Sequence, residues 1–275
     1  MNSNLRTYVL LFRPVSVIAM NLFLFVPILI QSHDVGFSFM QTLPFIVMLS
    51  GEIALNDCCD YEKDRISKPH RPLVKGCVDV RHAMIAAIGM IVLSVLLGVM
   101  VYRDTLLRMG CFLIVTTVLA AYNLKHPLVA MLKTVITAAM TVLTLSFVYT
   151  FTTFGRVQQF FLGAAFFFIL GREMLMDIRD IEGDNYNGYK TIVVRWGVRC
   201  VARLSFASFL ISAIFTVAMV LCLSSWIKLF LTLLILCFEF FCYIRCICVN
   251  KPDHQNKYIL LLWVPIMFML IVQLV

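Results

Sequence analysis

The chain has 275 residues, of which 61% are hydrophobic and only 14% are charged, and its mean hydropathy is +0.93. Soluble domains carry about 25% charged residues, so this composition excludes a soluble globular protein. The formal net charge of +8 would suit a nucleic-acid partner, but the Lys and Arg residues fall in short gaps between apolar runs, where they set membrane topology. We therefore expect a helical protein of the lipid bilayer and no nucleic-acid partner.

Apolar runs of about twenty residues recur along the whole chain, and a helix of that length crosses ~30 Å of hydrocarbon. The first run follows Arg13 and Pro14 without a small-residue cleavage pattern, so we expect a spanning helix and no cleavable signal. The sequence predicts an all-α fold with one domain over residues 1–275. In chain order the expected spans are 14–31, 38–57, 82–101, 106–122, 128–150, 157–176, 204–223, 226–244 and 258–275.

The distribution of Lys and Arg predicts the orientation of these nine spans. If the N-terminus is cytoplasmic, the cytoplasmic segments hold 18 of the basic residues and the opposite side holds four, while Lys133 falls inside a span. Positive charge marks the cytoplasmic side, so we expect the N-terminus inside and the C-terminus outside. The two long loops, near 58–81 and 177–203, then lie in the cytoplasm. An active site of this multi-pass membrane protein is expected to face the same side.

Ten cysteines are present, and several lie inside or at the edges of apolar runs without metal-ligand spacing. A disulfide framework is typical of small secreted domains and not of such a chain. We expect buried, reduced thiols that pack as small hydrophobic groups. The residues concerned are Cys222, Cys237, Cys242, Cys246 and Cys248.

Eight of the fifteen acidic residues are concentrated in two short windows, and both windows contain Asp-x-x-Asp-x-x-x-Asp. On a helix with ~100° per residue, the three aspartates of each motif fall within an arc of about 60° and point the same way. Glu62 and Glu182 lie about 140° from the first aspartate of their windows and are expected to face loop or solvent. The two triplets are Asp57, Asp60 and Asp64, and Asp177, Asp180 and Asp184.

Three carboxylates that face one point repel one another, and a charge inside a membrane helix costs about 2.5–3.5 kcal/mol, so the two triplets call for cations. Oxygen ligands without His or Cys suit Mg²⁺, which keeps positions for water and substrate phosphates. We therefore expect all six aspartates to be metal ligands for Mg²⁺ and a diphosphate to be the substrate. Solvated helix ends at the headgroup boundary and a transporter with carboxylates in its bundle are the alternatives.

Together with further motifs, the two windows resemble the UbiA superfamily of intramembrane prenyltransferases over nearly the whole chain. This resemblance implies nine helices in a ring around a central cavity, with cytoplasmic caps. It also implies that the two aspartate-rich motifs bind an isoprenyl diphosphate through Mg²⁺. The segments that carry it are Asn56-Asp57-x-x-Asp60-x-x-x-Asp64, His70-Arg71-Pro72-Leu73 with Gly76, Tyr122-x-x-Lys125, Asp177-x-x-Asp180-x-x-x-Asp184, Lys190-Thr191 and Trp196-Gly197.

Site residues follow partly from the residues themselves and partly from this resemblance. Arg65, Lys68, Arg71 and Lys75 follow the first cluster and can neutralise a leaving diphosphate. The resemblance implies that Tyr122 and Lys125 contact the diphosphate or shape the reacting end, although a Lys at a helix end is also an ordinary orientation signal. The expected catalytic residues are Asp57, Asp60, Asp180, Asp184, Tyr122 and Lys125, and the expected diphosphate-binding residues are Asn56, Arg71 and Lys125.

The expected reaction is Mg²⁺-dependent transfer of a prenyl group to a lipophilic acceptor, and family breadth favours an aromatic or quinone-precursor acceptor. The segment from Gly171-Arg172-Glu173 into the second cluster looks closest to the branch that prenylates glyceryl phosphate ethers. Arg179-Asp180-Ile181-Glu182 is also similar to the naphthoate branch of menaquinone synthesis. Prenyl transfer to a glyceryl phosphate ether, terpene cyclisation by the same fold, and a non-enzymatic transporter are the alternatives.

Polar residues inside the apolar runs have several interpretations at this point. Glu52 fits a cavity acid, a hydrogen-bonding residue inside its helix, or a proton acceptor. Arg172 and Glu173 fit either support for the second cluster or a local ion pair. For Asn21 and Glu239 a satisfied interhelical hydrogen bond is expected.

Overall fold

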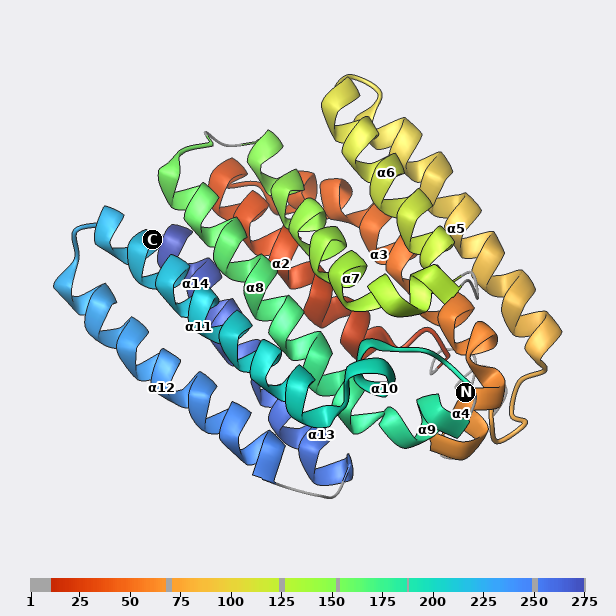
Figure 1. Cartoon of the computed structure of the whole chain (residues 1–275). Coiled ribbons are helices and arrows are strands. Elements are labelled where there is room, and N and C mark those ends of the chain that lie inside the picture. Colours follow the sequence, from red (N-terminus) through yellow and green to blue (C-terminus); the bar gives the residue numbers. More distant parts are fainter. Residues whose placement is uncertain are drawn as a thin grey trace. The chain divides into compact units, whose positions relative to one another are not determined.

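The computed structural model describes residues 11–67, 71–123, 127–151, 154–186, 188–248 and 252–274 (Figure 1). Within these ranges every regular element is helical, which confirms the all-α prediction. The elements are α2 (Pro14–Ser32), α3 (Val35–Cys59), α4 (Tyr61–Ser67), α5 (Val80–Tyr102), α6 (Leu106–Tyr122), α7 (Pro127–Ser146), the 3₁₀ turn η1 (Phe147–Thr150), α8 (Arg156–Arg179), α9 (Ile181–Tyr186), α10 (Ile192–Trp196), α11 (Val198–Cys222), α12 (Trp226–Cys248), α13 (Pro252–Leu261) and α14 (Trp263–Leu274).

Within the described ranges, six helical segments are long and apolar enough to cross a bilayer. They are Val35–Cys59, Val80–Tyr102, Leu132–Thr150, Val198–Cys222, Trp226–Cys248 and Gln255–Val272. Ser16–Ser32 and Leu106–Tyr122 are shorter apolar helices, and α8, which matches the expected span 157–176, ends in charged residues. The multi-pass helical architecture is therefore confirmed. The number nine and the cytoplasmic N-terminus stay predictions.

The segments expected as long loops contain short helices. α4 lies in 58–81, and α9 and α10 lie in 177–203. Some of their apolar residues are buried, with Leu73 3% exposed and Val193 fully covered, whereas Tyr186 and Trp196 are exposed. A helical turn satisfies backbone polar groups locally, which explains why segments next to apolar surroundings fold in this way.

Contacts divide the chain into two compact units. The first comprises residues 1–126 and 143–152, and the second comprises residues 127–142 and 153–275. The core of the first unit is aromatic. The ring of Phe45 lies 5.1 Å from that of Phe112 and 4.8 Å from that of Phe147, in edge-to-face contacts, and Tyr102 packs against all three. Such pairs contribute beyond their buried area and hold α3, α5, α6 and η1 together.

Small residues allow the helices of the first unit to approach closely. A Cβ on Gly51 of α3 would lie 2.9 Å from the backbone oxygen of Ala87 on α5. A Cβ on Gly98 of α5 would overlap the ring of Phe112 on α6. Glycine at both positions therefore sets the spacing of α3, α5 and α6, which are neighbours in the ribbon (Figure 1).

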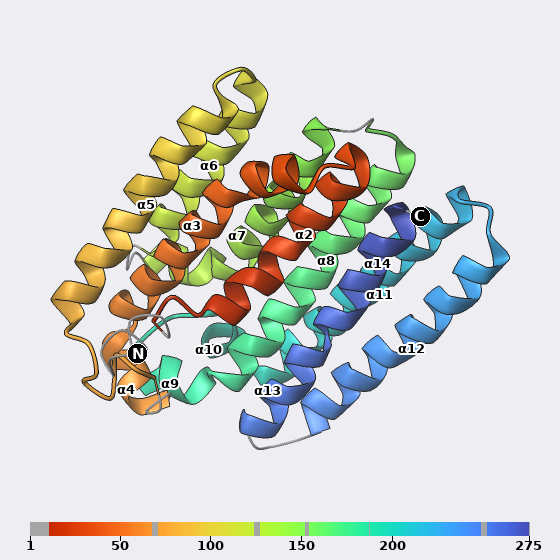
Figure 2. The ribbon, with the colours of Figure 1, turned by 180° about the vertical axis from the view of Figure 1, so that it is seen from behind.

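The second unit is built on the close packing of α8 against α11. Ser205 donates a hydrogen bond of 2.8 Å to the backbone oxygen of Gly171, and Ser212 donates one of 3.0 Å to that of Ala164. A helix interface of Gly, Ala and Ser is typical of membrane bundles, where hydroxyl groups bond across helices. α14 packs against both α8 and α12 (Figure 2). This packing fixes α8, the helix that leads into the second acidic cluster.

An acidic N-cap fixes the start of α5. The carboxylate of Asp79 accepts hydrogen bonds from the backbone N–H groups of Arg81 (2.9 Å) and His82 (3.2 Å). These bonds, of which the one from His82 has the larger effect, lower the pKa of Asp79 below its usual value. Asp79 therefore marks the point where the polar segment gives way to the apolar helix.

The ten cysteines are free thiols, which confirms the absence of a disulfide framework. Their expected burial is only partly right. Cys242 and Cys246 are buried, whereas Cys222, Cys237 and Cys248 are exposed on the protein surface. A thiol is apolar enough to be placed on an outward helix face of an apolar chain, so position in an apolar run does not establish burial.

Candidate active site

The two acidic motifs have the same backbone geometry. In the first, Asp57 lies near the end of α3, Asp60 lies at the break, and Asp64 lies in α4. In the second, Asp177 lies near the end of α8, Asp180 at the break, and Asp184 in α9. The break residues have φ −91°, ψ 9° and φ −92°, ψ 6°.

This geometry corrects the expectation that each triplet lies along one continuous helix. The long helix ends before the second aspartate, and a short helix begins after it. Hydrogen bonds continue across the break, from the Asp64 N–H to the Asp60 oxygen (2.8 Å) and from the Asp184 N–H to the Asp180 oxygen (3.0 Å). The arrangement of each triplet is therefore set by a bend, which the residue spacing alone does not reveal.

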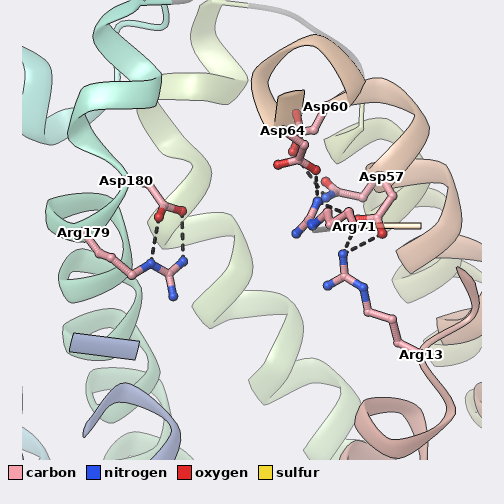
Figure 3. A network of polar contacts seen from close by, with 8 residues as sticks. Arg13, Asp57, Asp60, Asp64, Arg71, Arg179 and Asp180 are labelled. Carbon is pink, nitrogen blue, oxygen red and sulfur yellow. Dashed lines mark hydrogen bonds and ion pairs between the residues drawn. The ribbon is translucent and has the colours of Figure 1, made fainter. Parts of the chain in front are cut away.

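In the first cluster, two arginines form ion pairs with the carboxylates of Asp57 and Asp64 (Figure 3). Asp57 accepts hydrogen bonds from Arg13, at 2.6 Å to its Oδ2, and from Nη1 of Arg71, at 2.9 Å to its Oδ1. The same Nη1 of Arg71 forms an ion pair with Asp64. The side chains are largely buried, at 6% exposed for Asp57, 2% for Asp64 and 15% for Arg71. Arg71 thus joins the first and third aspartates of the motif.

Asn56 and Arg71 make further contacts within this cluster. Asn56 donates a hydrogen bond of 3.3 Å to Oδ2 of Asp60. Burial lowers the pKa of Arg71 below its usual value, and the negative charge of Asp57 opposes that effect. A largely buried guanidinium is well suited to bind a phosphate, because its planar donors match phosphate oxygens.

In the second cluster, each of the first two aspartates is held by a neighbouring side chain. Thr134 of α7 donates a hydrogen bond of 3.0 Å to Oδ2 of Asp177, and the positive charge of Lys133 acts on the same carboxylate. Arg179 binds Asp180 through two hydrogen bonds, of 2.7 and 2.9 Å (Figure 3). Asp177 and Asp184 are buried, at 5% and 1% exposed.

The structure separates the other expected residues into three groups. Tyr122 is the last residue of α6 and is half-buried, whereas Lys125 and Lys68 lie outside the described residues. Arg65 forms an exposed pair with Glu62 at 3.2 Å, and Lys75 is exposed, so neither joins the first cluster.

The outward positions of Glu62 and Glu182 are confirmed, since both side chains are exposed. Being exposed, they contribute no buried carboxylate to the clusters, in contrast to the first and third aspartates of each motif.

Polar residues within the spans have varied surroundings. Arg172 forms an ion pair of 3.0 Å with Glu173 and lies over the ring of Trp263, so the local ion pair is found. Asn21 donates to the backbone oxygen of Val17 in its own helix, and the expected interhelical hydrogen bond is wrong. Glu239 is fully buried, and neither of its carboxylate oxygens has a hydrogen bond to a described residue.

Arg13, Lys133 and Thr134 were not expected at the clusters from the sequence. In the sequence Arg13 contributes only to the topology count, and Lys133 falls inside a span without an assigned role. A Lys inside an apolar span was the available signal, since such charges pair with functional groups. Arg13 has φ 44°, a left-handed conformation that is rare for a residue before proline. This unusual backbone conformation distinguishes Arg13, but it is visible only in the structure and not in the sequence.

The donor set of the clusters fits Mg²⁺. Their side-chain ligands are carboxylate oxygens, the type that Mg²⁺ prefers. Asp57, Asp64, Asp177 and Asp184 are buried, which excludes water as the main source of charge compensation. No three such residues converge on one point among those the structure describes, and in the first cluster guanidinium groups hold the carboxylates. In each cluster the aspartates are the residues that would hold Mg²⁺.

Comparison with known proteins decides the family. The profile of the UbiA prenyltransferase family matches residues 13–272. The chain belongs to this family. A UbiA-family chain is an integral membrane protein that crosses the bilayer several times, which agrees with the six long apolar segments described above.

Several relatives of known name are digeranylgeranylglyceryl phosphate synthases. The chain is 30% identical over 213 residues, 74% of each chain, to the digeranylgeranylglyceryl phosphate synthase of Methanobrevibacter smithii. It is 31% identical over 167 residues, 58% of each chain, to the protein of that name from Methanosphaera stadtmanae. With the latter and with the protein of that name from Sulfurisphaera tokodaii, the chain spans a little over half the relative's length.

Solved structures show the same fold. The structure of a UbiA homolog from Archaeoglobus fulgidus bound to GPP and Mg²⁺ has a TM-score of 0.72, with 18% identity, over 98% of this UbiA-family chain and 100% of that chain. A structure of digeranylgeranylglyceryl phosphate synthase has a TM-score of 0.70, with 18% identity, over 98% and 97% of the two chains.

Proposed function

We propose that this protein transfers a prenyl group from an isoprenyl diphosphate to a hydroxyl group of a glyceryl phosphate ether, in a Mg²⁺-dependent reaction. The observation that carries the acceptor is the similarity, at 30% identity over 74% of both chains, to a digeranylgeranylglyceryl phosphate synthase. The comparisons support this alternative better than the aromatic or quinone-precursor acceptor that family breadth favoured.

The diphosphate half of the proposal is supported by the clusters. Each supplies carboxylates that bind the diphosphate through Mg²⁺, which neutralises charge that develops on the departing oxygens. Arg71 and Arg13, released from Asp57 when the cation is present, donate hydrogen bonds to phosphate oxygens. Asn56 holds Asp60 in place through its amide. Tyr122 and Lys125 are proposed at the reacting end, as the family motif implies.

The reaction itself needs no covalent enzyme intermediate. The bond between the allylic carbon and the diphosphate oxygen breaks, and both electrons leave with the diphosphate. The acceptor oxygen then forms the new carbon–oxygen bond and loses its proton. The apolar helices around the site exclude water, which would otherwise capture the allylic cation.

The cytoplasmic location of the site is likewise a proposal, and it is supported by the charge distribution. Cysteine labels at Lys75 and Tyr186, in a background without reactive native thiols, should react only from the cytoplasmic side. A label at Asp104 should react only from the other side. Opposite sidedness of positions 75 and 186 contradicts the proposal.

The central test offers purified protein labelled geranyl, farnesyl and geranylgeranyl diphosphates with Mg²⁺. Separate reactions contain a monoprenylated glyceryl phosphate, hydroxybenzoate or dihydroxynaphthoate as the acceptor. We expect a labelled ether product only with the glyceryl phosphate, and its loss with EDTA and in the variants Asp57→Asn and Asp180→Asn.

Two results contradict the proposal. A labelled aromatic product would restore the aromatic acceptor. A cyclic hydrocarbon or alcohol made at the same rate without any acceptor would identify a cyclase, because only a transferase needs a second substrate next to the cation.

A further inference from the structure

Glu52 is a buried carboxyl group that the proposed diphosphate site does not use. It lies in α3, is 5% exposed, and precedes Asn56 by one helical turn on the same face. Its Oε2 accepts a hydrogen bond of 3.0 Å from Nδ2 of Asn123, the C-cap residue of α6. Its Oε1 is buried and has no hydrogen bond to a described residue.

The hydrogen bond from Asn123 leaves Glu52 with spare capacity to accept a proton. Asn123 approaches with its N–H₂ group, which also reaches the backbone oxygen of Leu119 at 3.3 Å. The amide thereby supports one carboxylate oxygen of Glu52 while the other stays available. A carboxyl group in an apolar span is costly, and such groups are retained where they bind or move something.

Glu52 lies on the apolar side of the first acidic cluster along α3, where the proposed function requires the reacting carbon. Glu52 precedes Asp57 by five residues, which is about 7.5 Å along the helix axis at 1.5 Å per residue. It therefore lies deeper in the bilayer than the carboxylates that are proposed to hold the diphosphate. An isoprenyl chain extends from the diphosphate into the apolar region, so its first carbon lies on the same side of the carboxylates as Glu52.

We propose that Glu52 is the catalytic base that accepts the proton of the acceptor hydroxyl group. This inference rests on the proposed function. As the allylic carbon–oxygen bond breaks and its electrons leave with the diphosphate, an oxygen lone pair of the acceptor forms the new ether bond. The hydroxyl proton moves to Oε1 of Glu52 and from there to bulk water after product release. Asn123 is the positioning residue that holds the carboxylate in place.

The test separates capture of the cation from its formation. A prenyl diphosphate with ¹⁸O in the bridging position loses that position when it ionises and recombines, so positional isotope exchange reports ionisation without product. Wild-type protein, Glu52→Gln, Asn123→Ala and the control Glu62→Gln are compared in lipid nanodiscs with Mg²⁺ and the glyceryl phosphate acceptor. Glu62 is exposed and pairs only with Arg65 among the contacts described above.

Glutamine keeps an oxygen for the Asn123 amide but accepts no proton at the catalytic pH. We therefore expect Glu52→Gln to keep isotope exchange within about twofold of wild type and to lower ether formation by at least about 100-fold, the smaller end of general-base effects. Glu62→Gln should match the wild type in both measurements. Thermal unfolding and binding of labelled prenyl diphosphate establish that each variant is folded.

Two outcomes overturn the inference. Ether formation at the wild-type rate in Glu52→Gln shows that the carboxyl group takes no proton. Equal loss of isotope exchange in Glu52→Gln and Asn123→Ala shows that the pair only positions the segment around Tyr122 for the diphosphate. Absence of exchange and product in the wild type refutes the proposed function itself, and this inference falls with it.

Discussion

Replacing Arg71 by Met should make the protein dependent on a divalent cation for its stability. Nη1 of Arg71 contacts both Asp57 and Asp64, and the three side chains are 15%, 6% and 2% exposed. Arg71→Met keeps the bulk of the side chain but removes the positive charge that pairs with the two carboxylates. Removing one partner of a buried ion pair costs about 3–5 kcal/mol. The free energy of unfolding in EDTA should therefore fall by about that amount.

Mg²⁺ should restore most of this loss. A ligand at 100 times its dissociation constant stabilises the folded state by about 2.7 kcal/mol. In the wild type, a cation must displace the guanidinium of Arg71 from the carboxylates, so the stabilisation by Mg²⁺ without diphosphate should be smaller than in the variant. The matched control is Arg65→Met, which removes an exposed pair with Glu62 and should change stability by about 0.5 kcal/mol at most.

Thermal unfolding in nanodiscs, followed by tryptophan fluorescence with EDTA or Mg²⁺, measures both effects. If Arg71→Met is no less stable in EDTA than Arg65→Met, the ion pairs of the first cluster do not contribute to the stability of the protein. If Mg²⁺ stabilises the wild type and Arg71→Met equally, the carboxylates freed by the substitution are not a cation site.

Three further predictions concern catalysis, support of the second cluster and packing. Asp57→Asn should abolish prenyl transfer while the protein stays folded, whereas Glu62→Gln, whose side chain is exposed, should keep more than half of the rate; equal rates in an assay of labelled product contradict the assignment. Thr134→Val removes the hydrogen bond to Asp177 and should weaken Mg²⁺-dependent binding of prenyl diphosphate about 10-fold or more, as measured by titration. Unchanged affinity would show that Thr134 does not hold Asp177 in its binding position. Gly98→Ala should destabilise the protein by about 1–3 kcal/mol, because the ring of Phe112 on α6 fills the space that the new methyl group needs. The matched change Gly89→Ala, in the same helix with no atom within 4 Å, should stabilise the protein slightly. Thermal unfolding measures both, and the reverse order of stabilities refutes the packing described for α5.

The sequence was sufficient to predict the membrane helices and the two acidic motifs, because both are local patterns. Hydropathy gave boundaries close to the observed ones, as in 82–101 against Val80–Tyr102. The bends at Asp60 and Asp180 were not predictable, since the helical offsets of the aspartates are equally compatible with a straight helix.

The partners of the acidic residues could not be predicted from the sequence for a different reason. Arg13 is 44 residues from Asp57, and Thr134 is 43 residues from Asp177. Such pairs meet only through packing of separate helices, and a basic residue beside an apolar run has the same appearance whether it sets topology or holds a carboxylate. The identity of the acceptor was also open, because the motifs serve the diphosphate.

The bend after Asp60 has a consequence for how the first motif tolerates change in length. On a straight helix the first and third aspartates would be about 10 Å apart along the axis, yet one guanidinium nitrogen contacts both Asp57 and Asp64. Each inserted or deleted residue in α4 would rotate the third aspartate by ~100°. The number of intervening residues is thus under stricter constraint than their chemistry. The second motif repeats the spacing with Ile178 and Arg179 where the first has Cys58 and Cys59.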